Sequence, residues 1–62
     1  MTMAQRIYSL PTDVHYWYRD SYGYYIYKGK TKIYEVRILH RNGKRQQLIF
    51  SYSKEEWERE HK

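Results

Sequence analysis

An Asn-Gly pair at positions 42 and 43 constrains the fold of this chain more than any other feature of the sequence. It lies between two stretches, residues 32–40 and 45–52, that are rich in β-branched and aromatic residues. Asn-Gly suits a two-residue type I′ turn, in which both central residues take positive φ angles and the turn twists as the strands do. With this turn, Arg41 faces Lys44 and Val36 faces Ile49. The sequence therefore predicts a long antiparallel hairpin with a fixed register.

Two shorter strands are predicted before this hairpin. Residues 14–19 and 24–28 are rich in aromatic and β-branched residues, and turn-forming residues at 20–23 and at Gly29 separate the strands. We therefore expect the α+β class, with a small twisted antiparallel β-sheet of three to four strands in a meander and one short C-terminal helix. Residues 1–12 show little periodicity, and we expect a flexible or loosely docked N-terminal arm there, ahead of a single domain over residues 13–62.

The start of the C-terminal helix is predicted from its capping residues. Ser53 is a good N-cap and Glu56 follows three positions later, which is the pattern of a capping box. Tyr52 and Trp57 occupy the two positions of a hydrophobic staple. Because so short a helix is marginal alone, we expect Trp57 to dock it on the sheet. Basic side chains are expected near its C-terminal end, where they interact favourably with the negative end of the helix dipole. They are Arg59, His61 and Lys62.

Both faces of the predicted hairpin are half apolar, which a sheet with one solvated face would not be. One face therefore has to be covered by the C-terminal helix. The other has to meet the N-terminal strands, a second subunit or a ligand.

The length and the absence of cysteine set further limits. The chain has 62 residues, no cysteine and a mean hydropathy of −1.12. It can form one domain at most, without help from a disulfide. His15, His40 and His61 lack metal-ligand spacing. We therefore expect no metal and no cofactor, while self-association into a homodimer stays open.

Membrane and secretion signals are not recognised in the sequence. No apolar stretch approaches the roughly 18 residues of a membrane-spanning helix, and the first six residues lead into no apolar signal segment. We expect no membrane partner and a cytoplasmic protein, located in the host cytoplasm if the source is viral.

The positive charge is concentrated in the middle of the chain. The formal net charge is +5, and residues 28–45 hold seven Lys or Arg residues against one acid, Glu35. Lys28, Lys30 and Lys32 cluster at one turn; Arg41, Lys44 and Arg45 cluster at the next. Such a stripe can track a phosphate backbone, although lysines at turns and edges also keep small sheets soluble.

Aromatic residues lie beside this charge. Seven of the twelve residues from Tyr16 to Tyr27 are aromatic, and Tyr25 and Tyr27 share one face of their strand. An exposed set on a basic sheet would form a stacking platform for single-stranded nucleic acid; a dimer interface is the alternative. The residues we expect to bind nucleic acid are Lys28, Lys30, Lys32, Arg37, Arg41, Lys44, Arg45, Gln47, Tyr25, Tyr27 and Trp17.

Two families share parts of this pattern. The first resemblance is to the single-stranded-DNA-binding transcriptional coactivator family. It rests on the Lys28-Gly29-Lys30 turn, the Val36-Arg37-Ile38 strand, the Gly43-Lys44 turn and the helix start at residues 53–58. That resemblance implies a curved four-stranded sheet that binds single-stranded DNA, dimerisation through the helix and a role in transcription regulation.

The second resemblance is to the arm-binding N-terminal domains of phage integrases. It rests on residues 34–38, on residues 42–47 from Asn42 to Gln47, and on Lys54-Glu55-Glu56. It implies a three-stranded sheet that enters the DNA major groove, a short helix packed behind it and a phage or mobile-element context. Gln46 and Gln47 would then read base edges.

We therefore expect a small basic nucleic-acid-binding protein, with DNA favoured over RNA, and no enzyme. The sequence has no phosphate-cradling glycine loop. A small ribonuclease that uses His40, Arg37 and tyrosines is a minor alternative. The stronger alternative is a protein-interaction module, such as a small phage or plasmid inhibitor of a host factor, because exposed Tyr, Trp and Arg side chains also anchor protein interfaces.

Overall fold

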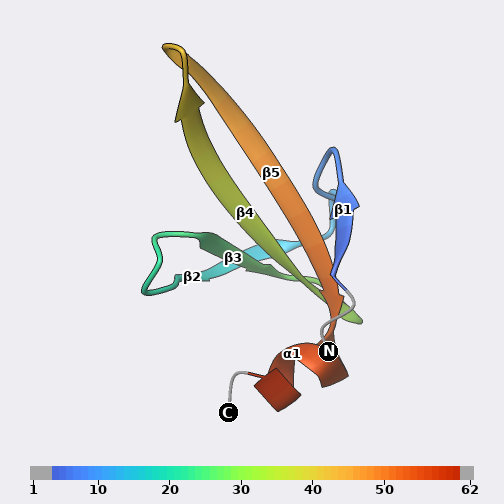
Figure 1. Ribbon diagram of the computed structural model, residues 1–62. Coiled ribbons are helices and arrows are strands. Elements are labelled where there is room, and N and C mark those ends of the chain that lie inside the picture. Colours follow the sequence, from blue (N-terminus) through green and yellow to red (C-terminus); the bar gives the residue numbers. More distant parts are fainter. Residues whose placement is uncertain (1–3, 61–62) are drawn as a thin grey trace.

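The computed structural model describes residues 4–60 and has the α+β architecture expected from the sequence (Figure 1). One five-stranded antiparallel sheet has the order β1-β5-β4-β3-β2. The elements are β1 (Gln5–Ile7), β2 (His15–Arg19), β3 (Tyr25–Lys28), β4 (Lys32–Arg41), β5 (Lys44–Ser53) and α1 (Lys54–Glu60). Residues 1–3 of the expected arm, and His61 and Lys62 at the expected helix end, lie outside the described residues.

The hairpin of β4 and β5 has the predicted turn and register. Asn42 and Gly43 have φ angles of 53° and 75°, as a type I′ turn requires. Val36 pairs with Ile49, and Arg41 pairs with Lys44. In Figure 1 this hairpin extends past the other strands, and its turn lies at the opposite end of the molecule from α1.

The sheet has one strand more than the three to four expected. Gln5 pairs with Ser51 and Ile7 with Ile49, so that β1 lies along the outer edge of β5. The Ser51 hydroxyl also donates a hydrogen bond to the Gln5 carbonyl oxygen over 3.3 Å. This pairing satisfies backbone groups of β5 that an open edge would leave unpaired. A strand of three residues is too short to leave an alternating pattern in the sequence, which is why the range 1–12 gave no strand signal.

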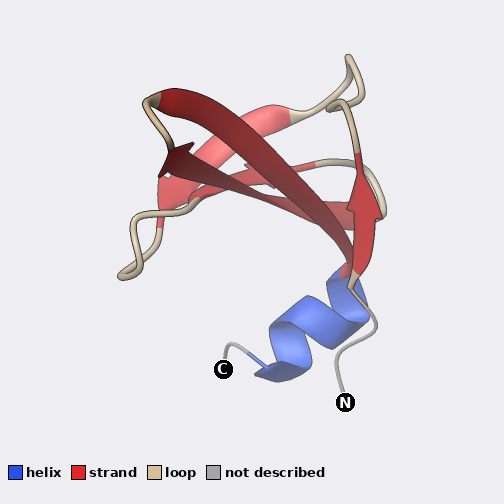
Figure 2. Cartoon of the chain, turned by 45° about the horizontal axis from the view of Figure 1, so that its top comes forward, coloured by secondary structure: helices blue, strands red, loops and turns tan. Residues whose placement is uncertain are grey.

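The helix packs on one face of the sheet, here called the helix face (Figure 2). The Glu56 amide donates a hydrogen bond to Ser53 Oγ over 3.2 Å, so Ser53 caps α1 as predicted. Trp57 is only 3% exposed and forms a core cluster with Ile26, Ile33 and Tyr52. Its ring centroid lies 5.2 Å from that of Tyr52, which confirms the predicted staple.

The opposite face of the sheet is here called the tyrosine face. Its strand positions, given by the register, are Gln5, Ile7, Tyr16, Arg19, Tyr25, Tyr27, Lys32, Tyr34, Val36, Ile38, His40, Arg45, Gln47, Ile49, Ser51 and Ser53. Tyr34, Val36 and Ile49 are buried there. The N-terminal strands extend the same sheet at its two edges and do not form a second layer over this face.

Candidate functional site

The acids are divided unevenly between the two faces of the sheet, although Lys and Arg lie on both. The strand positions of the tyrosine face include Arg19, Lys32, Arg45 and His40 but no Asp or Glu. Four of the seven acids of the chain lie in α1, on the other side of the sheet. Because the β4–β5 turn and α1 lie at opposite ends of the molecule (Figure 1), the helix carboxylates do not neutralise the cations beside that turn.

Three tyrosines from two neighbouring strands form an aromatic cluster on the tyrosine face. The ring centroid of Tyr16 lies 6.3 Å from that of Tyr25 and 5.7 Å from that of Tyr27. Tyr16 is 55% exposed, while Tyr25 and Tyr27 are half-buried. The cluster therefore packs against itself and still presents ring surface to solvent, as a stacking platform for bases requires.

Trp17 lies apart from this cluster because neighbouring side chains of a strand point to opposite faces, and Tyr16 faces the cluster. The Trp17 ring packs edge-on against Tyr18, with centroids 4.9 Å apart, and Lys28 Nζ lies 5.0 Å from its centroid. Tyr18 and Lys28 belong to the helix face. The side chain that the β-bulge re-aims is Tyr18, which strict alternation would place on the same face as Tyr16.

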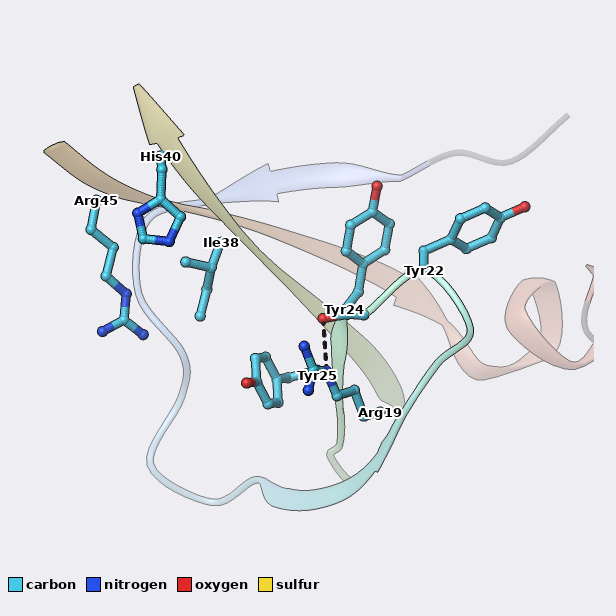
Figure 3. A pocket seen from close by; sticks show the side chains of 8 residues that line it. Arg19, Tyr22, Tyr24, Tyr25, Ile38, His40 and Arg45 are labelled. Atoms are coloured by element: carbon cyan, nitrogen blue, oxygen red, sulfur yellow. Dashed lines mark hydrogen bonds between the residues drawn. The ribbon is translucent and has the colours of Figure 1, made fainter. Parts of the chain in front are cut away.

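A cleft of about 530 Å³ opens between the β2–β3 turn and the β4–β5 hairpin (Figure 3). We call it the arginine cleft. In Figure 3, Ile38, His40 and Arg45 line it from the hairpin, while Arg19 and Tyr25 line it from the other side. Tyr22, Gly23 and Tyr24 complete its wall. The cleft therefore combines three basic side chains from three strands with aromatic and aliphatic surface.

The turn beside this cleft is fixed by Asp20. Its Oδ1 accepts hydrogen bonds from the amides of Tyr22 and Tyr24, at 3.0 and 2.9 Å. Gly23 has a φ of 86°, a conformation that suits glycine, and its carbonyl oxygen accepts a hydrogen bond from Arg19 Nε over 3.3 Å. The Arg19 guanidinium lies 5.1 Å from the Tyr25 ring centroid. Arg19 is thus held in place at the cleft wall.

Arg37, which we expected in the basic stripe, is engaged within the helix face. Its Nε donates a hydrogen bond to Glu35 Oε1 over 2.7 Å, and its guanidinium lies between the rings of Tyr24 and Phe50, 4.7 and 4.6 Å from their centroids. Burial lowers the pKa of Arg37, but the hydrogen bond and the charge of Glu35 outweigh burial, so the pKa is raised overall. The reason is alternation along β4, since positions 35 and 37 share one face.

The Glu35 carboxylate is buried and has a second partner. Tyr52 donates a hydrogen bond from its hydroxyl to Glu35 Oε1 over 3.3 Å. Burial raises the pKa of Tyr52 above its usual 10.0, and the neighbouring Glu35 charge raises it further, although Arg37 opposes the change. Arg37, Glu35 and Tyr52 thus form a polar network inside the helix face, which compensates for burying the carboxylate.

The other predicted site residues fall into separate groups. Tyr25 and Arg45 line the arginine cleft together, while Tyr27, Lys32 and Gln47 lie elsewhere on the tyrosine face. Arg41 and Lys44 are exposed beside the β4–β5 turn, on the helix-face side of the register. Lys28 and Lys30 line a second cleft of about 370 Å³ with Asp13, His15 and Gly29. The expected stripe is therefore two basic regions at opposite ends of the sheet.

Two basic residues of the arginine cleft were absent from the expected site. Arg19 and His40 come from strands that are not neighbours in the sheet. The signal for His40 was its cross-strand position opposite Arg45. No sequence signal placed Arg19 near the hairpin, because that approach depends on how the turn folds against the sheet.

Within residues 4–60, no group of three or more His, Asp or Glu side chains is arranged to hold a metal ion. The described part of the chain also holds no helix with the length and apolar character needed to cross a membrane. A scan against protein-family models, a search of curated proteins and a search of solved structures each found no match to this chain.

Proposed function

We propose that this protein is a small nucleic-acid-binding protein that uses the tyrosine face and the adjoining end of the β4–β5 hairpin. The observation that carries the proposal is the distribution of the acids: the strand positions of the tyrosine face hold Arg19, Lys32 and Arg45 and no carboxylate, while four acids lie in α1. Binding that depends on phosphate contacts needs such a surface, because each neutralised phosphate releases a counterion.

The end of the hairpin adds to the positive region. His40 pairs across the strands with Arg45, and Arg41 with Lys44, and all four side chains are exposed. Between Val36 and Ser53 the chain has no Asp or Glu. A polyanion that meets this end therefore finds cations on both sides of the ribbon and no local repulsion.

The aromatic cluster supports a nucleic acid over other polyanions. Tyr16, Tyr25 and Tyr27 lie on the same face as Arg19 and Arg45. Stacking of a base on an aromatic ring contributes about 1–3 kcal/mol and tolerates any sequence. We propose a binding protein, not an enzyme, with DNA as the favoured ligand. A role in transcription regulation, a phage or mobile-element context and a homodimer rest on the two family resemblances and the small core.

The test is fluorescence anisotropy with labelled single-stranded DNA, duplex DNA and RNA of one sequence. Affinity is measured at about 50 and 200 mM salt, a range over which binding through several phosphates weakens steeply. Arg45→Ala should weaken binding and flatten the salt dependence, since it removes one phosphate contact. Arg59→Ala is the matched control, because it removes the same charge from exposed α1, at the other end of the molecule.

The alternative of a protein-interaction module predicts a different outcome. Tyr22 is 80% exposed and Trp17 is 46% exposed, and such rings can anchor a protein partner. If none of the three nucleic acids binds at low salt, or if Arg45→Ala and Arg59→Ala weaken binding equally, the nucleic-acid proposal is wrong.

A further inference from the structure

We propose that the arginine cleft is a nucleotide-binding site, in which Arg19, His40 and Arg45 hold the phosphate and Tyr25 and Ile38 contact the base. The inference deepens the proposed function by assigning one nucleotide to one place. It also predicts a property of its own, which is the binding of a free nucleotide.

Basic side chains from three strands converge on the cleft. Arg19 lies at the end of β2, whereas His40 and Arg45 face each other across β4 and β5. All three line the same cleft, and none of its lining residues is an Asp or Glu. Arg19 and Arg45 carry like charges, which repel each other, so an anion between these two side chains relieves an unfavourable arrangement. Two arginines and a histidine offer the donors that a phosphate accepts.

Arg19 is already positioned at the wall of the cleft. Its Nε is used in the hydrogen bond to the Gly23 carbonyl oxygen, and the guanidinium has four further N–H donors. Its place over Tyr25, 5.1 Å from the ring centroid, limits its rotamers further. A side chain held in this way loses little conformational entropy when a ligand binds.

The cleft also has an apolar part. Tyr25 and Ile38 are half-buried and line it together with the cations. The volume of about 530 Å³ is within the range of small-molecule sites. Inorganic phosphate would use the cations alone, and a nucleoside would use the apolar surface alone. A nucleotide uses both, which selects this ligand class.

The direct test is a nuclear magnetic resonance titration of the ¹⁵N-labelled protein with a nucleoside monophosphate, the matching nucleoside and inorganic phosphate. The nucleoside monophosphate should shift the amide signals of Tyr25, Ile38 and Arg45, and bind at least about tenfold more tightly than either of its parts. Equal binding of inorganic phosphate, or shifts confined to other residues, would overturn the nucleotide site.

A pair of neighbouring variants separates the cleft from general charge. Arg45→Gln removes a cation from the cleft, while Lys44→Gln removes one from the adjacent exposed position outside the cleft. Arg45→Gln should weaken nucleoside monophosphate binding by about tenfold, as expected for one charge-assisted hydrogen bond. Lys44→Gln should change it by less than about twofold, because an exposed charge outside the site is screened. Equal losses would show that the cleft is not the site.

Two trinucleotides, one with a 5′-phosphate and one with a 5′-hydroxyl, distinguish the source of the phosphate. Preference for the 5′-phosphate assigns the cleft to a strand end, and equal binding assigns it to phosphates within a strand. If oligonucleotides bind but no arm of the titration reaches the cleft, this inference fails and the proposed function stands. If the free nucleotide binds the cleft but no oligonucleotide binds, the proposed function fails and the site stands.

Discussion

Replacing Trp57 with alanine tests how α1 is held to the sheet. Trp57 is 3% exposed and packs with Ile26, Ile33 and Tyr52. A buried aromatic side chain removes about 150–250 Å² from water, which corresponds to about 4–6 kcal/mol at 25 cal/mol per Å². Measured Trp-to-Ala changes in cores cost about 3–5 kcal/mol. We therefore expect Trp57→Ala to lower the free energy of unfolding by about 3–5 kcal/mol.

This loss is large for so small a domain. At about 0.05–0.15 kcal/mol per residue, the whole chain has roughly 3–9 kcal/mol of stability. Trp57→Ala should therefore leave the protein largely unfolded, or lower its Tm by well over 10 °C, at about 4–8 °C per kcal/mol. Circular dichroism during thermal and urea unfolding measures the change.

Trp17→Ala provides the matched control, because it removes the same side chain from a position that is 46% exposed. We expect a cost of about 1 kcal/mol or less, since its contacts are with Tyr18 and Lys28 at the surface. If both variants lower the Tm equally, or if Trp57→Ala leaves it unchanged, α1 is not held by Trp57 and the reasoning is refuted.

Three further outcomes are expected from other parts of the fold. Arg37→Ala should lower the free energy of unfolding by about 1–3 kcal/mol, because the buried Glu35 carboxylate loses a charged partner. Urea unfolding measures this loss. A loss of nucleic-acid affinity without a loss of stability would contradict a structural role for Arg37. Burial raises the pKa values of Tyr52 and Tyr18. The neutral hydroxyl of each tyrosine therefore contributes fully to stability below pH 10, and this contribution is lost as the pH rises through the raised pKa values. Tm should then fall on the alkaline side of pH 10, and less so in a Tyr52→Phe variant; a flat Tm profile up to pH 11 would be inconsistent with the shifts. Gly43→Ala should cost about 1–2 kcal/mol for holding alanine at a positive φ, since an added Cβ would meet no atom within 4 Å; an unchanged unfolding midpoint would exclude this cost.

Local sequence predicted the hairpin and the helix correctly. Asn42-Gly43 favours a type I′ turn, and the register from Arg41–Lys44 to Val36–Ile49 follows from it because residues pair in step from the turn. The Ser53 cap and the packing of Tyr52 on Trp57 likewise depend on residues a few positions apart. Interactions between near neighbours in the sequence leave patterns that can be recognised.

The candidate site was predicted less well, for reasons that concern particular residues. Arg37 was expected to be available to a ligand, but alternation places it beside Glu35 and between two rings. Trp17 was grouped with Tyr25 and Tyr27 as a binding residue, but it lies on the face opposite Tyr16, beside Lys28, and the bulge in β2 brings Tyr18 to that face as well. The rings of Tyr24 and Phe50 that flank Arg37 come from outside β4, and a bulge depends on the facing strand, so a single stretch of sequence specifies neither.

The amino-acid pattern of this protein was enough to establish the antiparallel strands β2–β5, the type I′ turn, the capped helix and the excess of positive charge. Tertiary structure settled the attachment of β1 to β5, the face that α1 occupies and the approach of Arg19 to His40 and Arg45. The physical difference is one of range. Turns, caps and alternation are set by backbone preferences and by contacts over a few residues, whereas edge pairing and the arginine cleft form only when segments far apart in the chain fold against one another.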